Sequence, residues 1–282
     1  MELLRSPWRN IFLDFSRSIE ENATIVSPYI SAQPLEEIAV SVQTPKSVQF
    51  NICTKLDSNS ILHGSLDLNA IQKFCYKFPI TTVKHLPSLH AKVYIADDHT
   101  AIITSGNLTI SSLSRNLEYG IRVHDKETIS QISDDIQQYQ RFGCEISLQR
   151  LNDLCKQSNR MVKAYLDAND SNSAEIQLND RLDRQRKKFQ NSIEKLRGES
   201  GATITSIFSQ TVLHVLKDGP LTTFQINLCI QDLHPDLCDD SKDRVINGVH
   251  FGKKWKHHVR NAQQALKRKN QILLIDGKWQ LP

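Results

Sequence analysis

Residues 89–95 alternate apolar and polar side chains, and this period of two restricts the segment to a β-strand with one buried face. His90 and Lys92 hold two of the polar positions, so on a strand their side chains project from the same face. A second short strand is expected at Thr100–Thr104. Asp97 lies at the connection and is expected to hold the turn by hydrogen bonding. The pattern therefore predicts a β-hairpin that presents an imidazole and an ammonium together.

A polar turn, Ser105-Gly106-Asn107, follows the second strand and adds hydrogen-bond donors. Cleavage of an anionic phosphodiester needs groups that neutralise its non-bridging oxygens and a nucleophile that attacks phosphorus. Lys92 and Asn107, with Ser105, suit the first task, and neutral His90 suits the second through a covalent intermediate. A carboxylate usually fixes the tautomer of such an imidazole, and Glu118 in the next apolar stretch is the candidate.

The spacing H-x-K-x-x-x-x-D, the Ser-Gly-Asn turn and the later Asn-Leu-Glu resemble the active-site motif of the phospholipase D superfamily. The matching positions are His90, Lys92, Asp97, Ser105, Asn107 and Glu118. Many members carry Gly where this chain has Thr104. Residues 23–30 resemble the first strand of the family, so the resemblance covers about the N-terminal half. It implies an α/β fold, a phospholipase D-like mixed sheet flanked by helices.

The superfamily normally assembles one catalytic centre from two motifs. The other H-x-K here, His124-Asp125-Lys126, lacks the later Asp and the Ser-x-Asn turn, and we interpret it as chance. A single motif resembles bacterial nucleases and metal-independent restriction endonucleases that share one active site across a homodimer. The resemblance implies that His90 attacks while the partner subunit's His90 protonates the leaving oxygen, without a metal or another cofactor.

The length and the hydropathy of the chain limit its class and its location. Its 282 residues leave room for two domains. No apolar run approaches the ~20 residues that span a bilayer, and the first residues lack a signal-peptide core, so we expect a cytoplasmic protein without a membrane partner. The cysteines lack metal-ligand spacing and are expected to be reduced packing residues rather than zinc ligands: Cys53, Cys75, Cys144, Cys155, Cys229 and Cys238.

Positive charge is concentrated near the C-terminus. The formal net charge is +4, yet residues 201–282 hold 11 Lys or Arg and 7 Asp or Glu, against 14 and 16 in residues 1–150. As a helix, residues 253–269 would place Trp255, Val259, Ala262 and Leu266 on one apolar stripe. Basic and amide side chains of this segment are the candidate DNA contacts, to phosphates and base edges: Lys253, Lys254, Lys256, His257, Arg260, Gln264 and Lys267.

The surroundings of this basic helix predict a small module. A helix over residues 204–215 ends before Gly219-Pro220, and a capping box at Thr222–Gln225 starts another that runs to about Leu233. Residues 272–281 predict a β-hairpin turning at Asp276-Gly277. This order resembles the winged-helix modules of restriction endonucleases, including those of the Mrr type. A winged helix used for protein contacts or dimerisation is the alternative.

We therefore predict a phospholipase D-like catalytic domain at residues 1–150, a helical linker at 151–200 and a winged-helix DNA-binding domain at 201–282. In the linker, helices are expected at 151–166 and 173–197 around a turn at 167–173, and the second helix packs on the nuclease dimer or pairs with its twin.

The sequence predicts a metal-independent phosphodiesterase that cleaves double-stranded DNA through a phosphohistidine, of restriction or defence type, acting as a homodimer. The alternatives are a non-catalytic DNA-binding regulator on a relic nuclease fold and a phospholipase-type lipid hydrolase.

Overall fold

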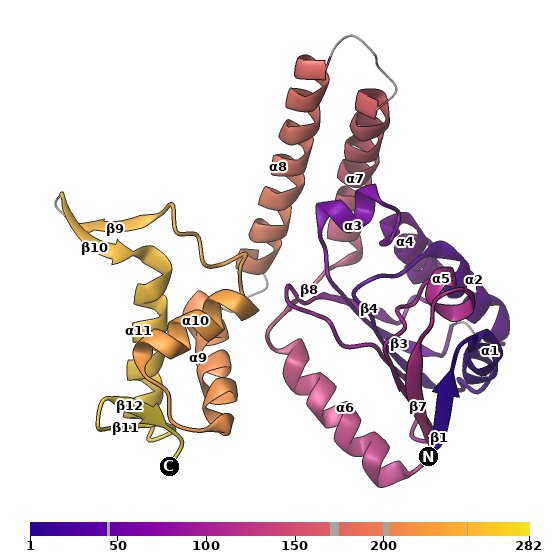
Figure 1. Ribbon diagram of the computed structural model, residues 1–282, viewed down its shortest axis with the longest axis horizontal. Coiled ribbons are helices and arrows are strands. Elements are labelled where there is room, and N and C mark those ends of the chain that lie inside the picture. The colour runs from indigo at the N-terminus through magenta and orange to yellow at the C-terminus, as the bar shows by residue number, and fades with distance from the viewer. Residues whose placement is uncertain (44–45, 170–174, 200–202, 247) are drawn as a thin grey trace. The chain divides into compact units, whose positions relative to one another are not determined.

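The computed structural model describes residues 1–43, 46–169, 175–199, 203–246 and 248–282 (Figure 1). The described chain forms two compact units, one made of residues 1–140 and 144–196, the other of residues 141–143 and 197–282. Each unit has its own apolar core. Residues 151–196, which the sequence assigned to a linker, belong to the first unit.

An eight-stranded mixed sheet is the centre of the first unit. Its spatial order is β1-β7-β6-β5-β2-β3-β4-β8, in which β2, β3 and β4 are parallel and the other pairs are antiparallel. The strands are β1 (Glu2–Arg5), β2 (Asn22–Val26), β3 (Gln49–Thr54), β4 (Thr81–His85), β5 (Val93–Ala96), β6 (Thr100–Thr104), β7 (Tyr119–Val123) and β8 (Cys144–Glu145).

Helices cover both faces of this sheet (Figure 1). They are α1 (Arg9–Arg17), α2 (Ala32–Ser41), α3 (Ser58–Leu62), α4 (Leu68–Lys77), α5 (Ile110–Ser114), α6 (Lys126–Gln140), α7 (Leu148–Asn169) and α8 (Glu175–Glu199). Alternation along β5 divides the two cores, since Tyr94 packs in the cluster of α1, α2, α4 and α7, whereas Ile95 packs with α6. The predicted fold class, a mixed sheet flanked by helices, is confirmed.

The hairpin of β5 and β6 forms where it was predicted, with Val93 opposite Ile103 and Ala96 opposite Thr100. The placement of His90 and Lys92 on its first strand was wrong, because β5 begins only at Val93. Pairing of β5 with β2 starts at Val93, and the Leu89 N–H turns back to the carbonyl of Leu86. The two polar residues therefore lie in irregular backbone just before the strand.

Helix α8 packs against its own chain. Leu182, Phe189, Ile193 and Leu196 are buried in the same core as Leu154 and Met161 of α7. These four side chains are buried without a contact to a nuclease dimer or to the same helix of a second chain, the two contacts that the sequence left open. Of the turn predicted at residues 167–173, positions 167–169 are helical, and the rest lie outside the described residues.

The described residues of the second unit form three α-helices, a short 3₁₀ helix and two β-hairpins. Its elements are α9 (Ile204–Val215), the 3₁₀ helix η1 (Leu216–Asp218), α10 (Thr223–Leu233), β9 (Asp243–Ile246), β10 (Val249–Lys253), α11 (Lys254–Arg268), β11 (Leu273–Ile275) and β12 (Lys278–Gln280). The predicted capping box is present, since Thr222 accepts from Gln225 N–H and the Gln225 side chain accepts from Thr222 N–H. The hairpin of β9 and β10, directly before α11, was not predicted.

The predicted apolar stripe of α11 is buried, since Trp255, Val259, Ala262 and Leu266 all lie in the core of the second unit. The six cysteines are free thiols, and all except Cys229 are buried. In the described part of the chain, no helix combines the length and the apolar character needed to cross a membrane.

Candidate active site

His90 and Lys92 are in direct contact at the start of β5. The Lys92 ammonium donates to the backbone carbonyl of His90 at 2.6 Å and lies 3.3 Å from Nδ1 and 3.4 Å from Nε2 of the imidazole. Lys92 is 7% exposed, whereas the His90 side chain is exposed. The arrangement combines a solvent-accessible imidazole with an ammonium that the fold holds in place.

Burial lowers the pKa of the Lys92 ammonium below its ordinary value, and the charge of the Glu118 carboxylate partly offsets this effect. Lys92 is thus placed where it can interact both with the imidazole and with the Glu118 carboxylate. An ammonium held in a poorly hydrated site interacts more strongly with an incoming phosphate than one that is fully solvated.

The polar turn after β6 lies beside this pair, because the Thr104 N–H donates to the backbone carbonyl of Lys92 at 3.2 Å. Ser105 donates its hydroxyl to Glu118 Oε2 at 2.5 Å and accepts from the Tyr119 N–H at 3.1 Å. Asn107 has a buried Oδ1 without a hydrogen-bond partner among the described residues. The structure therefore gathers both halves of the predicted site at one end of β5 and β6.

Glu118 contacts the turn rather than the imidazole. Its carboxylate accepts from Ser105 and from Asn116 Nδ2, the latter at 3.2 Å, and no hydrogen bond joins it to His90 in the described part of the chain. In this conformation Glu118 acts on the site through the Ser105 hydroxyl and through its charge near Lys92. Its predicted role as the group that orients the imidazole stays a prediction.

Trp8 and Tyr94 pack against the turn at Gly106, and the sequence analysis did not predict either contact. The Tyr94 hydroxyl donates to the carbonyl of Gly106 at 2.9 Å, and the Trp8 indole donates to the Ser112 carbonyl at 2.8 Å. A Cβ at Gly106 would lie 2.9 Å from the Trp8 ring, so glycine permits this close approach. The glycine was visible in the sequence, but its distant aromatic neighbour was not.

Thr104, at the position where the resembled motif often has glycine, takes part in the turn. Its hydroxyl donates to the Tyr119 carbonyl at 3.2 Å and accepts from the Gly106 N–H at 3.1 Å. The substitution is thus accommodated by two hydrogen bonds that a glycine could not form.

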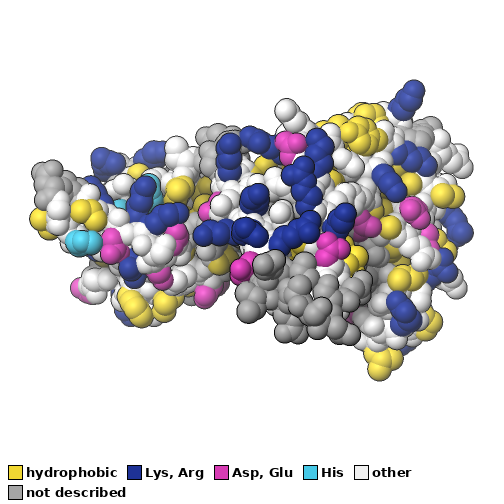
Figure 2. All heavy atoms as spheres, turned by 90° about the horizontal axis from the view of Figure 1, so that it is seen from above, with side chains coloured by type: hydrophobic (Ala, Val, Ile, Leu, Met, Phe, Trp, Pro, Cys, Tyr) yellow, Lys and Arg dark blue, Asp and Glu magenta, His cyan; other side chains and the backbone are white. Residues whose placement is uncertain are grey.

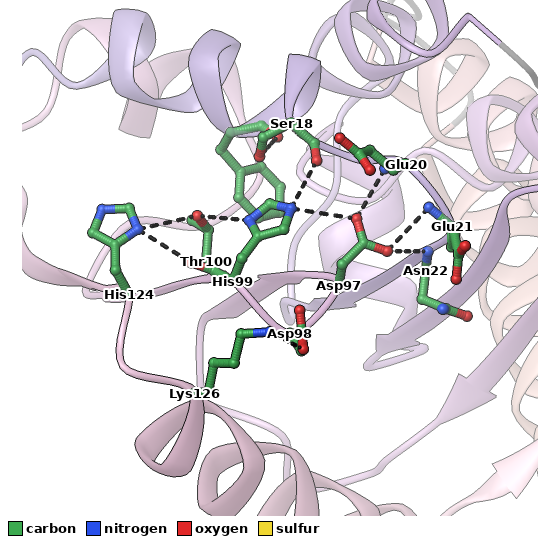
Figure 3. Close-up of polar contacts among 11 residues, drawn as sticks. Ser18, Glu20, Glu21, Asn22, Asp97, Asp98, His99, Thr100, His124 and Lys126 are labelled. Carbon is green, nitrogen blue, oxygen red and sulfur yellow. Dashed lines mark hydrogen bonds and ion pairs between the residues drawn. The ribbon is translucent and has the colours of Figure 1, made fainter.

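Asp97 lies at the opposite end of β5, where Figure 3 shows its carboxylate facing the chain before β2. The carboxylate accepts from the backbone N–H groups of Glu20, Glu21 and Asn22 at 2.7–3.0 Å. Asp97 also has a positive φ of 49°, a conformation that Asp tolerates better than most residues. Its hydrogen bonds tie the hairpin turn to the neighbouring strand.

The second H-x-K lies at this same end (Figure 3). His124 Nδ1 is 3.3 Å from the Thr100 hydroxyl and 3.1 Å from the His99 carbonyl, and Lys126 pairs with Asp98 at 2.7 Å. These side chains connect β6, β7 and α6. They lie at the turn of the hairpin, whereas His90 lies at its open end.

The predicted DNA contacts fall into two groups in the second unit. Lys253 forms an ion pair with Asp243 at 2.9 Å, and His257 is 2.6 Å from Arg244 and 3.1 Å from the Phe251 carbonyl. The unpredicted hairpin of β9 and β10 supplies these partners. Contact of Lys253 and His257 with DNA stays a prediction.

The other predicted contacts stay on the outer side of α11. Lys256 lies 5.3 Å from the centre of the Trp255 ring, and Arg260, Gln264 and Lys267 are exposed. Spacings of four and three residues place these four side chains along one stripe of the helix. Lys254, at the first position of α11, is also exposed.

Among the described residues, no three His, Cys, Asp or Glu side chains are grouped closely enough to hold a metal ion. The donor set of the candidate site is an imidazole, an ammonium, an amide and a hydroxyl, with one carboxylate. Such a set suits recognition of an anionic oxygen-rich group.

Residues 17–140 match the family model described as "Cardiolipin synthase, PLD-like domain". The matched range covers less than half of the chain but contains the whole candidate site. This part of the chain is therefore similar in sequence to phospholipase D-like domains. No curated protein matches the sequence.

Three solved structures are partly similar to this chain. NucT from Helicobacter pylori is 19% identical, with a TM-score of 0.40 over 49% of this chain and 93% of its own. Nuc from Salmonella typhimurium is 16% identical, with a TM-score of 0.44 over 51% and 95%. The phosphatidylserine synthase of Haemophilus influenzae Rd KW20 is 16% identical, with a TM-score of 0.41 over 51% and 39%. At these values the similarity says nothing about substrate.

Proposed function

We propose that the protein is a metal-independent phosphodiesterase that cleaves double-stranded DNA through a phosphohistidine, as a restriction or defence endonuclease. The observation that carries this proposal is the contact between exposed His90 and buried Lys92 beside the polar turn at Ser105. The phospholipase D-like match over the same residues supports the reaction class. The basic stripe of α11 supports nucleic acid as the substrate.

In the first step, a ring nitrogen of His90 attacks phosphorus, and the bond from phosphorus to the leaving oxygen breaks as a general acid gives that oxygen a proton. In the second step, water attacks phosphorus, the bond from phosphorus to nitrogen breaks, and the same group takes the proton from water. Lys92, Asn107 and Ser105 stabilise the negative charge that grows on the non-bridging oxygens in both steps.

The general acid is assigned to the partner subunit's His90, because among the described residues His90 is the one histidine in contact with Lys92. His90 has no hydrogen-bond contact with another histidine among the described residues, and His99 and His124 lie at the other end of the hairpin. His85 is buried, with its Nδ1 accepting from the Leu56 N–H. A homodimer would bring the second imidazole to the reaction.

Reading of DNA is assigned to the second unit. Arg260, Gln264 and Lys267 are exposed on a helix whose opposite side is buried, which leaves cations and an amide for phosphates and base edges. The second unit would supply affinity, and the first would supply chemistry. Arg260→Ala should therefore weaken duplex binding while a small activated phosphodiester is still hydrolysed.

Incubation of the full chain with end-labelled duplex DNA in excess EDTA tests the chemistry. We expect cleavage to persist and an acid-labile, base-stable phosphoenzyme to be trapped on His90 during turnover. Loss of cleavage in EDTA with recovery in magnesium would contradict the mechanism.

Mixed dimers test the shared site. A dimer of wild-type and His90→Ala chains keeps one nucleophile but loses its acid, so activity should fall more steeply than the wild-type fraction. A linear fall, or a fully active monomer in sedimentation, would contradict the dimer. Release of headgroups from phospholipid vesicles, without cleavage of DNA, would favour a lipid hydrolase instead.

A further inference from the structure

Helices α7 and α8 form a groove of about 250 Å³ in the first unit. It lies between the beginning of α7 and the end of α8, as expected for two antiparallel helices joined at their far ends. Side chains from both helices line it: Arg150, Asp153, Leu154, Lys156, Gln157, Arg160, Ser192, Lys195 and Leu196. Neither the family match at residues 17–140 nor the basic stripe of α11 includes any of them.

The lining of this groove is strongly cationic. Arg150, Lys156, Arg160 and Lys195 contribute four positive charges, and Asp153 contributes one negative charge. The acidic residue pairs with Lys156 at 3.7 Å, but both side chains stay well exposed, so this surface pair costs little to separate. Figure 2 shows many Lys and Arg side chains across the middle of its view.

The cations continue along the helices beyond the groove. Lys188 lies seven residues before Lys195 on α8, which places it on the same stripe about 10 Å away. Both side chains are exposed. Positive groups spaced along a line fit successive phosphates of a polymer better than a single free phosphate.

The apolar residues of the groove argue against a lipid surface as its partner. Leu154 and Leu196 are 2% and 5% exposed, so they form the floor and offer little area for insertion. Basic helices that bind membranes usually expose Trp, Phe or Leu beside their cations.

We propose that the α7–α8 groove is a second phosphate-binding surface, which holds the backbone of a nucleic acid independently of α11. This proposal rests on the proposed function, which supplies nucleic acid as the class of substrate. It adds that the groove in the first unit contributes to the affinity for that substrate. The groove binds without base recognition, because its cations contact phosphates and carry no sequence information.

Duplex binding by the full chain over a salt series tests the groove. Lys156→Gln combined with Arg160→Gln removes two phosphate contacts, so the slope of log K against log salt should fall by about two and affinity by about 30-fold at 150 mM salt. Lys46→Gln combined with Lys73→Gln removes two exposed cations of the same unit outside the groove, and should leave both quantities unchanged.

A charge-preserving pair, Lys156→Arg with Arg160→Lys, should bind like the wild type. The proposal would be overturned if this pair lost as much duplex affinity as the glutamine pair. An unchanged salt slope in the glutamine pair would overturn it too. Loss of binding to phosphatidylglycerol vesicles with unchanged duplex binding would also overturn it, in favour of a lipid surface. Hydrolysis of bis(p-nitrophenyl) phosphate should be equal in all variants, and its absence in the wild type would count against the proposed chemistry without affecting the binding result.

Discussion

The two ends of the β5–β6 hairpin carry similar residues in different states. At one end, His90 is exposed and contacts a buried Lys92, and Asn107 keeps a buried oxygen without a partner among the described residues. At the other, Asp97 accepts three backbone hydrogen bonds, and Lys126 pairs with Asp98 in the open. The candidate site therefore differs from the Asp97 end in two ways. Its Lys92 ammonium is buried, and the Asn107 side-chain oxygen has no hydrogen-bond partner among the described residues.

The largest contrast is expected between the two histidines. His90→Ala should reduce phosphodiester hydrolysis by about 10³-fold or more, because it removes the nucleophile. His124→Ala should leave hydrolysis near the wild-type rate, since its contacts connect strands. Steady-state kinetics on one small diester measures both, with circular dichroism to check folding. A comparable loss of hydrolysis in both variants would contradict the assignment of chemistry to the His90 end of the hairpin.

Asp97→Ala should lower stability without removing the chemistry. It leaves three backbone N–H groups without their acceptor and places alanine at a positive φ, for a loss of about 2–3 kcal/mol in the free energy of unfolding. Asp97→Asn is the matched control, because its Oδ1 can still accept from Glu21 and Asn22, and it should lose less. Denaturant titration gives both values. Equal stability of Asp97→Ala and wild type would remove the structural assignment.

The pH dependence of kcat/KM sharpens the comparison at Lys92. The ammonium must be protonated to stabilise the phosphate, and burial lowers its pKa, so activity should decline on the alkaline side below the range of an ordinary lysine. In Lys92→Arg the guanidinium stays charged, so this alkaline decline should disappear even though the rate is lower. Persistence of the same decline in Lys92→Arg would assign it to another group.

The smallest effect is expected at Lys126. Its ion pair with Asp98 joins two side chains that are 73% and 70% exposed, where solvent screens the attraction. Lys126→Ala should leave both the melting temperature and hydrolysis unchanged within error. A clear fall in either quantity would mean that the second H-x-K is more than a surface contact.

Local patterns predicted much of the molecule. The short strand predicted at Thr100–Thr104 has the bounds of β6, and the helical period placed Trp255 and Val259 of α11 in a core. The same reasoning failed where pairing partners decide the outcome. Val93 is the first residue of β5 to pair with β2, so His90 lies outside the strand despite the alternation around it.

The sequence by itself determined the candidate motif, the hairpin that carries it and the buried stripe of α11, because covalent spacing and periodicity need no distant partner. Only the tertiary structure decided that Glu118 is held by Ser105, that Lys253 is paired with Asp243, and that α7 and α8 enclose a cationic groove. The physical reason is that each of these depends on contacts between separate elements. The free energy of such contacts arises from burial and charge pairing that no single segment contains.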